Sequence, residues 1–305
     1  MNKEPLTASR MSSLLSCPRK HFLSYEIGLK SNNDAMALRF GSAWHRAMEA
    51  RWNKADFETA LAAAIADTTF DEITLATLSG LLAGYYAHYA NEEVATLHPE
   101  VEFRHDIKGS RTFDSAGKID GLGTMHDGRI CKVEHKTAGE DISNESDYWL
   151  RLNLNQQVLQ YVTAARLHGW NVEVVLYDVT RKPAIRQKQN ETPEQFGERL
   201  AADTKERPDF YFQRRECPVL DCDLAEFEVQ RLELARNILA YRKAERRLEH
   251  REQAWPRNVN GITCRQCSFS SFCLQNLRVN PDMPPSGFHV GEKHSELSAA
   301  IGEVQ

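Results

Sequence analysis

The sequence lacks any long hydrophobic run: none of its 305 residues lies in an apolar stretch of about 18, so no membrane span is expected. Its opening, MNKEPLTASR, has no apolar core of a secretory signal. The GxxxxGK[ST] phosphate loop is also absent, because the AGK at 116–118 has the wrong spacing and is followed by Ile119. These absences predict a cytoplasmic protein without an ATP motor of its own.

The chain has no excess of positive charge. Its net charge is −5, with 41% hydrophobic and 27% charged residues, which is ordinary for a globular protein. The whole molecule therefore does not attract nucleic acid electrostatically, and DNA binding would need a local basic groove or bound cations. No internal repeats are evident.

The seven cysteines cannot all pair within one chain. In a reducing cytosol, clustered cysteines are better interpreted as metal ligands than as disulfides. Cys264, Cys267 and Cys273 lie together in ITCRQCSFSSFC, and Cys17 lies far upstream in LLSCPRKHFL. Four thiolates can hold either a structural Zn²⁺ ion or an iron–sulfur cluster, and the local spacing does not separate the two.

Hydrophobic periodicity predicts an α/β fold with a central mixed sheet flanked by helices. Three antiparallel strands between residues 100 and 138 are followed by a helix over 149–168 and a buried strand over 171–180. A polar helix near 192–205 and a long helix over 223–253 complete the pattern. We expect one domain over residues 1–277 and a loosely ordered tail over 278–305. Its parts are a helical insertion over 36–97, a catalytic core over 100–215 and a helical, cysteine-bearing cap over 216–277 that Cys17 closes.

Asp120 is followed fourteen residues later by Glu134-His135-Lys136. In a strand, residues i and i+2 face the same way, so Glu134 and Lys136 share one face. A hairpin turn at 126–128 would bring Asp120 close to that face. Carboxylates are the ligands that Mg²⁺ and Mn²⁺ prefer, the His135 carbonyl is a further available ligand, and Lys136 could stabilise charge on a phosphate. The alternative is an exposed hairpin with ordinary charges.

Three further residues support the catalytic interpretation. His45 follows Gly41 at the start of a predicted helix, and imidazole is a ligand for Mn²⁺. Gln157 and Tyr161 lie four residues apart on one helical face just after the strands. Each of them alone is explained as well by ordinary packing.

Taken together, these residues resemble the PD-(D/E)XK nuclease superfamily, and more closely its RecB-like branch. The branch motifs GxxxH, GxxD, (D/E)xK and QxxxY correspond in order to Gly41–His45, Gly117–Asp120, Glu134–Lys136 and Gln157–Tyr161. The resemblance implies a restriction-endonuclease-like core and metal ligation by His45, Asp120 and Glu134. It also implies a catalytic Lys136, with Gln157 and Tyr161 supporting the site and the DNA. Glu102 is a looser match to the branch's earlier acidic residue.

One cysteine before the core and three after it is the arrangement of iron–sulfur nucleases, such as the AddB-type and CRISPR-associated RecB-like exonucleases. The WPRN at 255–258 fits the same pattern. The resemblance implies a [4Fe–4S] cluster held by Cys17, Cys264, Cys267 and Cys273, which would tie together the two ends of the domain. Cys131, Cys217 and Cys222 have no place in it.

The expected function is an exonuclease on single-stranded DNA or DNA ends, serving recombination, repair or phage replication in a bacterial or phage-infected cell. Because the chain has no motor, it either acts by itself on DNA ends or works with a separate helicase or recombination protein. Two alternatives remain: a catalytically silent DNA-binding or scaffolding subunit, and a hydrolase of another phosphate ester. The aromatic residues at 210–212 could stack on bases or pack in a buried strand.

Overall fold

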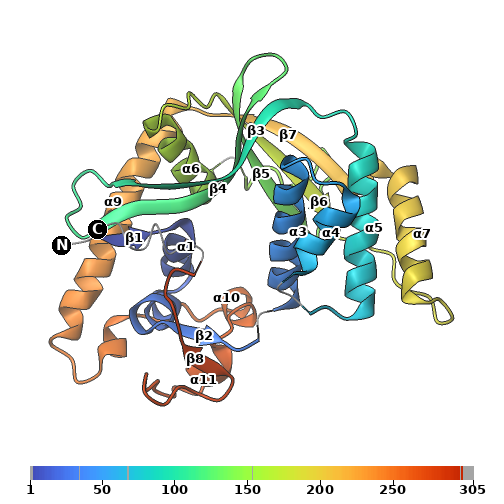
Figure 1. Cartoon of the computed structure of the whole chain (residues 1–305). Coiled ribbons are helices and arrows are strands. Elements are labelled where there is room, and N and C mark those ends of the chain that lie inside the picture. The colour runs from blue at the N-terminus through green and yellow to red at the C-terminus, as the bar shows by residue number, and fades with distance from the viewer. Residues whose placement is uncertain (1–2, 34, 67–68, 153, 296, 298–305) are drawn as a thin grey trace.

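Six strands form one mixed sheet at the centre of the computed structural model, which describes residues 3–33, 35–66, 69–152, 154–295 and 297 (Figure 1). They are β1 (Glu4–Leu6), β3 (Val94–Asp106), β4 (Phe113–Met125), β5 (Ile130–Ala138), β6 (Val174–Arg181) and β7 (Phe212–Pro218). Their order is β1-β4-β5-β6-β7, and β3 also pairs with β4. The β1–β4 and β5–β6 pairs are parallel and the others are antiparallel. The expected α/β class with a mixed sheet is confirmed.

One face of the sheet is covered by a helical layer, seen on the right of Figure 1. Its helices are α3 (Met36–Trp52), α4 (Phe57–Ile65), α5 (Glu72–His88) and α7 (Pro193–Glu206). Apolar residues recur every three or four positions in α3, where Phe40, Trp44 and Met48 are all buried. The helices expected between 36 and 97 are present, although β3 already begins at Val94.

The opposite face is covered by α6 (Gln156–Leu167), which packs on β3, β4 and β6. The predicted helix over 149–168 starts later because the Asn155 side chain accepts hydrogen bonds from the backbone N–H groups of Gln157 and Val158. Residues 126–128 form the expected hairpin turn, in which Gly128 has a positive φ of 91°.

The two ends of the chain build a helical cap on the left of Figure 1. It contains α1 (Ala8–Ser16), α2 (Pro18–His21), the π-helix η1 (Phe22–Ile27), α9 (Asp221–Glu245), the 3₁₀-helix η2 (Arg251–Ala254), α10 (Gly261–Arg265) and α11 (Ser270–Cys273). The long helix expected over 223–253 therefore ends at Glu245. Buried apolar residues from both chain ends, including Leu14 and Ile238, form one cluster.

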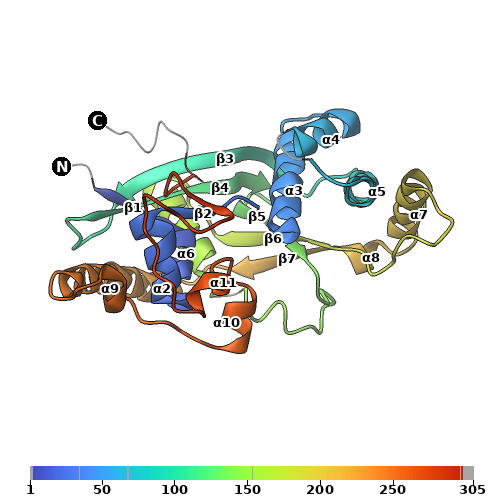
Figure 2. The ribbon, with the colours of Figure 1, turned by 90° about the horizontal axis from the view of Figure 1, so that it is seen from below.

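Two strands outside the central sheet were not predicted. β2 (Leu29–Ser31) pairs antiparallel with β8 (Phe288–Val290), and the two lie side by side in Figure 1, whereas Figure 2 shows this region from below. β8 belongs to the segment expected to be a loose tail. Of that segment, residue 296 and residues 298–305 lie outside the described part of the chain.

The aromatic residues at 210–212 belong to α8 (Pro208–Tyr211) and to the start of β7. Tyr211 and Phe212 are buried, so they pack in the core and are not available to stack on bases. Among the described residues, no helix is long and apolar enough to cross a membrane.

Candidate active site

Strand β5 carries the charged residues of the ExK pattern on one face and buried residues on the other. Lys132, Glu134 and Lys136 alternate with Val133 and His135 along the strand. Val133 packs into the core made with α3 and α5, and His135 contacts Trp52 of α3. Glu134 and Lys136 therefore share the opposite face, as the two-residue period of a strand requires.

The Glu134 carboxylate lies between the side-chain amino groups of two lysines. Lys132 contacts one of its oxygens and Lys136 contacts the other. Glu134 and Lys132 are both fully buried, and the Lys132 ammonium lies 5.3 Å from the centre of the Tyr161 ring. Burial lowers the pKa of Lys132 to about 7 and also lowers the pKa of Lys136. The two lysines thus hold Glu134 in place within the protein.

Asp120 lies on β4, the neighbouring strand of the hairpin, and both of its carboxylate oxygens have a partner. The backbone N–H of His135 donates a hydrogen bond to Oδ2 at 3.0 Å. The Nδ1 atom of His45 lies 3.6 Å from Oδ1. Burial raises the pKa of Asp120, but His45 and Lys132 outweigh it and lower that pKa to about 2. Asp120 is therefore a carboxylate at neutral pH.

His45 comes from α3, one turn after Gly41. A Cβ atom at Gly41 would lie 3.8 Å from Thr137 Oγ1 of β5, so the helix approaches the strand closely at this point. Desolvation lowers the pKa of His45, although the neighbouring Asp120 opposes that shift. The shift favours the neutral imidazole, the form in which histidine binds metals.

Gln157 and Tyr161 connect α6 to the strands. The Lys136 ammonium donates a hydrogen bond to Gln157 Oε1 at 3.0 Å, and Gln157 Nε2 donates to the Tyr161 hydroxyl at 3.4 Å. A Cβ atom at Gly117 of β4 would lie only 2.8 Å from Tyr161 Cε1, so glycine is needed for α6 to sit this close. All four predicted motifs therefore meet at one place.

A cleft of about 630 Å³ opens above these residues. His45, Asp120, Gln157 and Tyr161 all line it, whereas Glu134 is buried and contributes no surface. One wall is α3 from Ala37 to Glu49, and the other includes Ser9 near the start of the chain. The cleft therefore lies between the helical layer and the cap.

Several charged residues of the site were not predicted. Glu49 lines the cleft four residues after His45 on α3, and Glu100 lines it from β3, where its backbone has a positive φ of 57°. Glu100 forms an ion pair with Lys118, which lines the cleft as well. Glu102, the residue matched from the sequence, is the cross-strand partner of Lys118.

The residues present suit a hard divalent cation in their chemistry. Asp120 and Glu134 offer carboxylate oxygens, His45 offers a neutral imidazole, and the His135 carbonyl belongs to the same stretch. Within the described ranges, no three His, Cys, Asp or Glu side chains are spaced to hold a metal ion. Glu134 faces the two lysines, so it would have to exchange at least one of these contacts to reach a cation beside Asp120.

The four cysteines matched from the sequence line one small pocket in the cap. Cys17 comes from the junction of α1 and α2, while Cys264, Cys267 and Cys273 come from α10, α11 and the segment between them. Each of the four thiols is free and partly exposed, and the backbone N–H of Asn258 contacts Cys17 Sγ at 3.4 Å. The fold thus brings together cysteines separated by most of the chain.

The other three cysteines lie elsewhere. Cys131 and Cys217 are buried in β5 and β7, and Cys222 is exposed at the start of α9. The four cysteines that lie together in the structure are therefore the four that the sequence pattern grouped, and the remaining three lie outside that group.

The mixed sheet flanked by helices is consistent with a restriction-endonuclease-like core. A sequence model of the PD-(D/E)XK nuclease superfamily matches residues 5–274, and the chain belongs to this superfamily. The match spans both the cleft and the cysteine pocket. No curated protein matches the sequence.

Two solved structures are similar to this chain at low sequence identity. One, named "Putative exonuclease" from Eubacterium rectale, is 14% identical with a TM-score of 0.51, and the alignment covers 92% of this chain and 90% of that one. The crystal structure of SSO0001 is 13% identical with a TM-score of 0.38, over 91% of this chain and 89% of that one. The similarity to the Eubacterium rectale structure supports the fold alone.

Proposed function

We propose that this protein is a metal-dependent deoxyribonuclease of the RecB-like branch, acting as an exonuclease on single-stranded DNA or DNA ends. The observation that carries the proposal is the convergence of His45, Asp120, Gln157 and Tyr161 on one cleft, with Glu134 and Lys136 next to them on β5. Members of the superfamily are nucleases, and the arrangement suits phosphodiester hydrolysis.

Each residue has a distinct part in the proposed reaction. Asp120, Glu134 and His45, with the His135 carbonyl, would hold Mg²⁺ or Mn²⁺, which polarises a phosphate and lowers the pKa of a bound water. Lys136 would donate a hydrogen bond to that water or to a phosphate oxygen where charge develops. Gln157 keeps the Lys136 ammonium oriented through its 3.0 Å hydrogen bond, and Tyr161 in turn contacts Gln157.

We further propose that Cys17, Cys264, Cys267 and Cys273 hold a [4Fe–4S] cluster, with a structural Zn²⁺ as the alternative. Their common pocket supports this, because only a folded cap assembles thiols from both ends of the chain. The cluster would join the ends of the domain without taking part in hydrolysis. We expect the protein to act in the reducing cytosol, where such thiols stay reduced. A helicase or recombination protein would supply the ATP motor that this chain lacks.

The test compares the purified wild type with Asp120→Asn on two substrates, an end-labelled linear single strand and a covalently closed single-stranded circle, in Mn²⁺ or Mg²⁺. We expect the wild type to degrade the linear strand and spare the circle, and Asp120→Asn to lose at least 100-fold in rate. Asp127→Asn is the matched control, because Asp127 is exposed in the turn of the same hairpin.

The outcomes separate the candidate functions. Degradation of both substrates would make the protein an endonuclease. A folded wild type that binds DNA but cleaves neither substrate in either metal would favour the silent-subunit alternative. Equal rates for Asp120→Asn and the wild type would overturn the proposed site.

A further inference from the structure

His135 is held at both ring nitrogens by buried partners. Trp52 Nε1 donates a hydrogen bond to His135 Nε2 at 3.0 Å, and Asp178 Oδ2 lies 3.2 Å from His135 Nδ1. An indole N–H can only donate, so Nε2 is the unprotonated nitrogen and Nδ1 carries the proton toward Asp178. All three side chains are at most 5% exposed. The ring therefore has one tautomer and one orientation.

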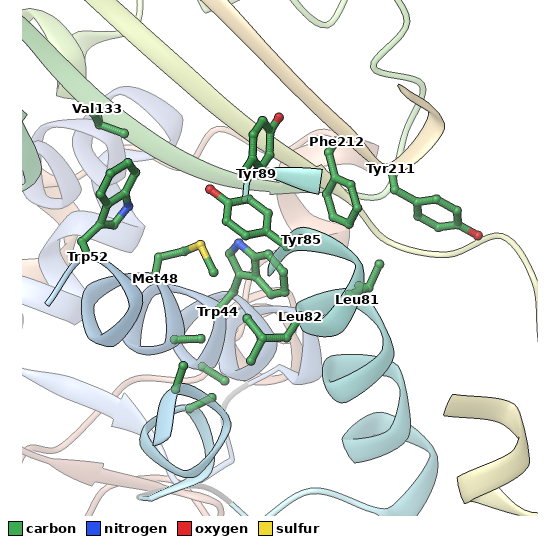
Figure 3. Packing of buried hydrophobic residues seen from close by; sticks show 14 of the residues in the cluster. Trp44, Met48, Trp52, Leu81, Leu82, Tyr85, Tyr89, Val133, Tyr211 and Phe212 are labelled. Carbon is green, nitrogen blue, oxygen red and sulfur yellow. The ribbon is translucent and has the colours of Figure 1, made fainter. Parts of the chain in front are cut away.

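Asp178 is itself fixed by two further groups. Its Oδ2 atom accepts a hydrogen bond from the Tyr85 hydroxyl and lies 3.3 Å from an Arg214 guanidinium nitrogen. Arg214 also pairs with Glu92 and lies 3.7 Å from the centre of the Tyr89 ring. Figure 3 shows Trp52 projecting from α3 toward Val133 of β5, with Tyr85 and Tyr89 projecting from α5 and its end into the same core. These partners leave the Asp178 carboxylate little freedom to move.

The backbone of the same histidine contacts Asp120, which lines the cleft. Its N–H donates to Asp120 Oδ2 at 3.0 Å, and its ring lies edge-on to the ring of His45, 6.2 Å away. The register pairs His135 with Asp178 across the parallel β5–β6 ladder, so this network anchors β5 at residue 135. A shift of β5 at this residue would move the Asp120 carboxylate.

From this geometry we propose that Trp52, His135 and Asp178 are positioning residues that orient Asp120 for metal binding through the His135 backbone. The inference rests on the proposed function, because it takes Asp120 to be a metal ligand. A buried apolar side chain, such as Val133 two residues earlier, would pack this face without desolvating polar groups. Polar groups behind a metal ligand are expected where the ligand must be oriented.

Trp52→Phe and His135→Phe test the proposal by removing the hydrogen bonds while keeping aromatic packing. The readout is the dissociation constant for Mn²⁺ without DNA, measured by electron paramagnetic resonance of the free ion, together with the thermal unfolding temperature. Loss of partners outside the coordination shell typically weakens metal affinity 10–100-fold, so we expect at least tenfold weaker binding in both variants. Trp255→Phe is the control, because it loses a comparable indole hydrogen bond, to Glu245 in the cap.

Wild-type Mn²⁺ affinity in Trp52→Phe would overturn the proposal, and this variant decides the matter if His135→Phe does not fold. Equal weakening in Trp255→Phe would also overturn it, because the effect would then reflect general destabilisation. If the wild type cleaves DNA and binds Mn²⁺, and Trp52→Phe binds Mn²⁺ equally tightly, the nuclease function stands and only the positioning role is rejected. A wild type that binds no Mn²⁺ and cleaves DNA in neither metal would reject both.

Discussion

Lys132 contacts Glu134 two residues further along β5, and neither side chain is exposed to solvent. A buried lysine is costly unless a carboxylate compensates its charge. Lys136 holds the other side of the same carboxylate. The two lysines therefore determine where the proposed metal ligand lies before any cation binds.

The first prediction concerns the pH dependence of stability. Burial lowers the pKa of Lys132 to about 7, below its unfolded value of 10.5, so the unfolded chain binds more protons between these limits. The free energy of unfolding is therefore highest above pH 10.5, where Lys132 is neutral in both states. It decreases as the pH falls toward 7, because the unfolded chain then binds a proton that the folded protein does not. Urea unfolding from pH 7 to 9.5 should show the wild type gaining stability relative to Lys132→Met, by up to about 1.4 kcal/mol per pH unit.

The comparison with Lys132→Met removes the contributions of every other group that titrates in this range. Lys243→Met is a suitable control, because Lys243 lies near the end of α9, in the cap and away from β5. Parallel stability curves for the wild type and Lys132→Met would show that Lys132 keeps an ordinary pKa in the folded protein.

A second prediction follows from the close approach of α6 to β4. In Gly117→Ala the new methyl would lie 2.8 Å from Tyr161 Cε1 and 2.9 Å from Phe103 Cζ, distances at which one of the rings must move. Overpacking of this kind costs about 1–3 kcal/mol, and displacing Tyr161 also disturbs Gln157 and Lys136. We expect a lower unfolding temperature and at least tenfold slower DNA cleavage.

Gly139→Ala is the matched control for this effect, because a Cβ atom there would meet no atom within 4 Å. It should leave both the stability and the cleavage rate close to those of the wild type. A stable and fully active Gly117→Ala variant would contradict the idea that Tyr161 must keep its position.

Only part of the site had a local pattern in the sequence. The two-residue period of β5 placed Glu134 with Lys136, and the turn at 126–128 predicted the hairpin that brings Asp120 alongside. His45, Gln157 and Tyr161 were selected by resemblance, since helical spacing alone is explained equally well by packing. The fold class followed from the alternation of strand and helix periods.

The contacts that the sequence could not predict are non-local. Glu100 reaches the cleft through a positive φ in the middle of β3, for which no sequence signal exists at a glutamate. Asp178 interrupts the otherwise apolar run over residues 174–179 of β6, and its role depends on pairing with β5. By contrast, Lys132 shares the two-residue period of Glu134 and was overlooked, although a second lysine on that face was predictable.

A third prediction tests the cysteine pocket. Protein purified without oxygen should be brown, with broad absorption near 400 nm and about four iron atoms per chain, as expected for a thiolate-bound [4Fe–4S] cluster. Cys267→Ser should lose most of the iron, whereas Cys222→Ser should retain it, because Cys222 is exposed at the start of α9 and away from the pocket. A colourless protein with one zinc per chain would favour the Zn²⁺ alternative.

A fourth prediction concerns a cluster of charges that joins the two ends of the chain independently of the cysteines. Arg242 of α9 pairs with Glu4 of β1 and with Glu26 of η1. Arg10 of α1, which is almost fully buried, pairs with the same two glutamates. Removing one partner of a buried ion pair leaves the other uncompensated, at a typical cost of about 3–5 kcal/mol. We expect Glu26→Gln to lose a substantial part of that, because Glu26 is only 6% exposed.

Urea unfolding of the metal-free protein measures the contribution of these ion pairs to stability when no metal is bound at the cysteine pocket. Glu233→Gln is the matched control, since Glu233 pairs with Arg236 on the exposed surface of α9, where an ion pair contributes little. If the charge cluster holds the ends together, Glu26→Gln should be clearly less stable than Glu233→Gln, and limited proteolysis should release the N-terminal segment first. Equal stability of the two variants would show that the charge cluster contributes no more than an exposed ion pair.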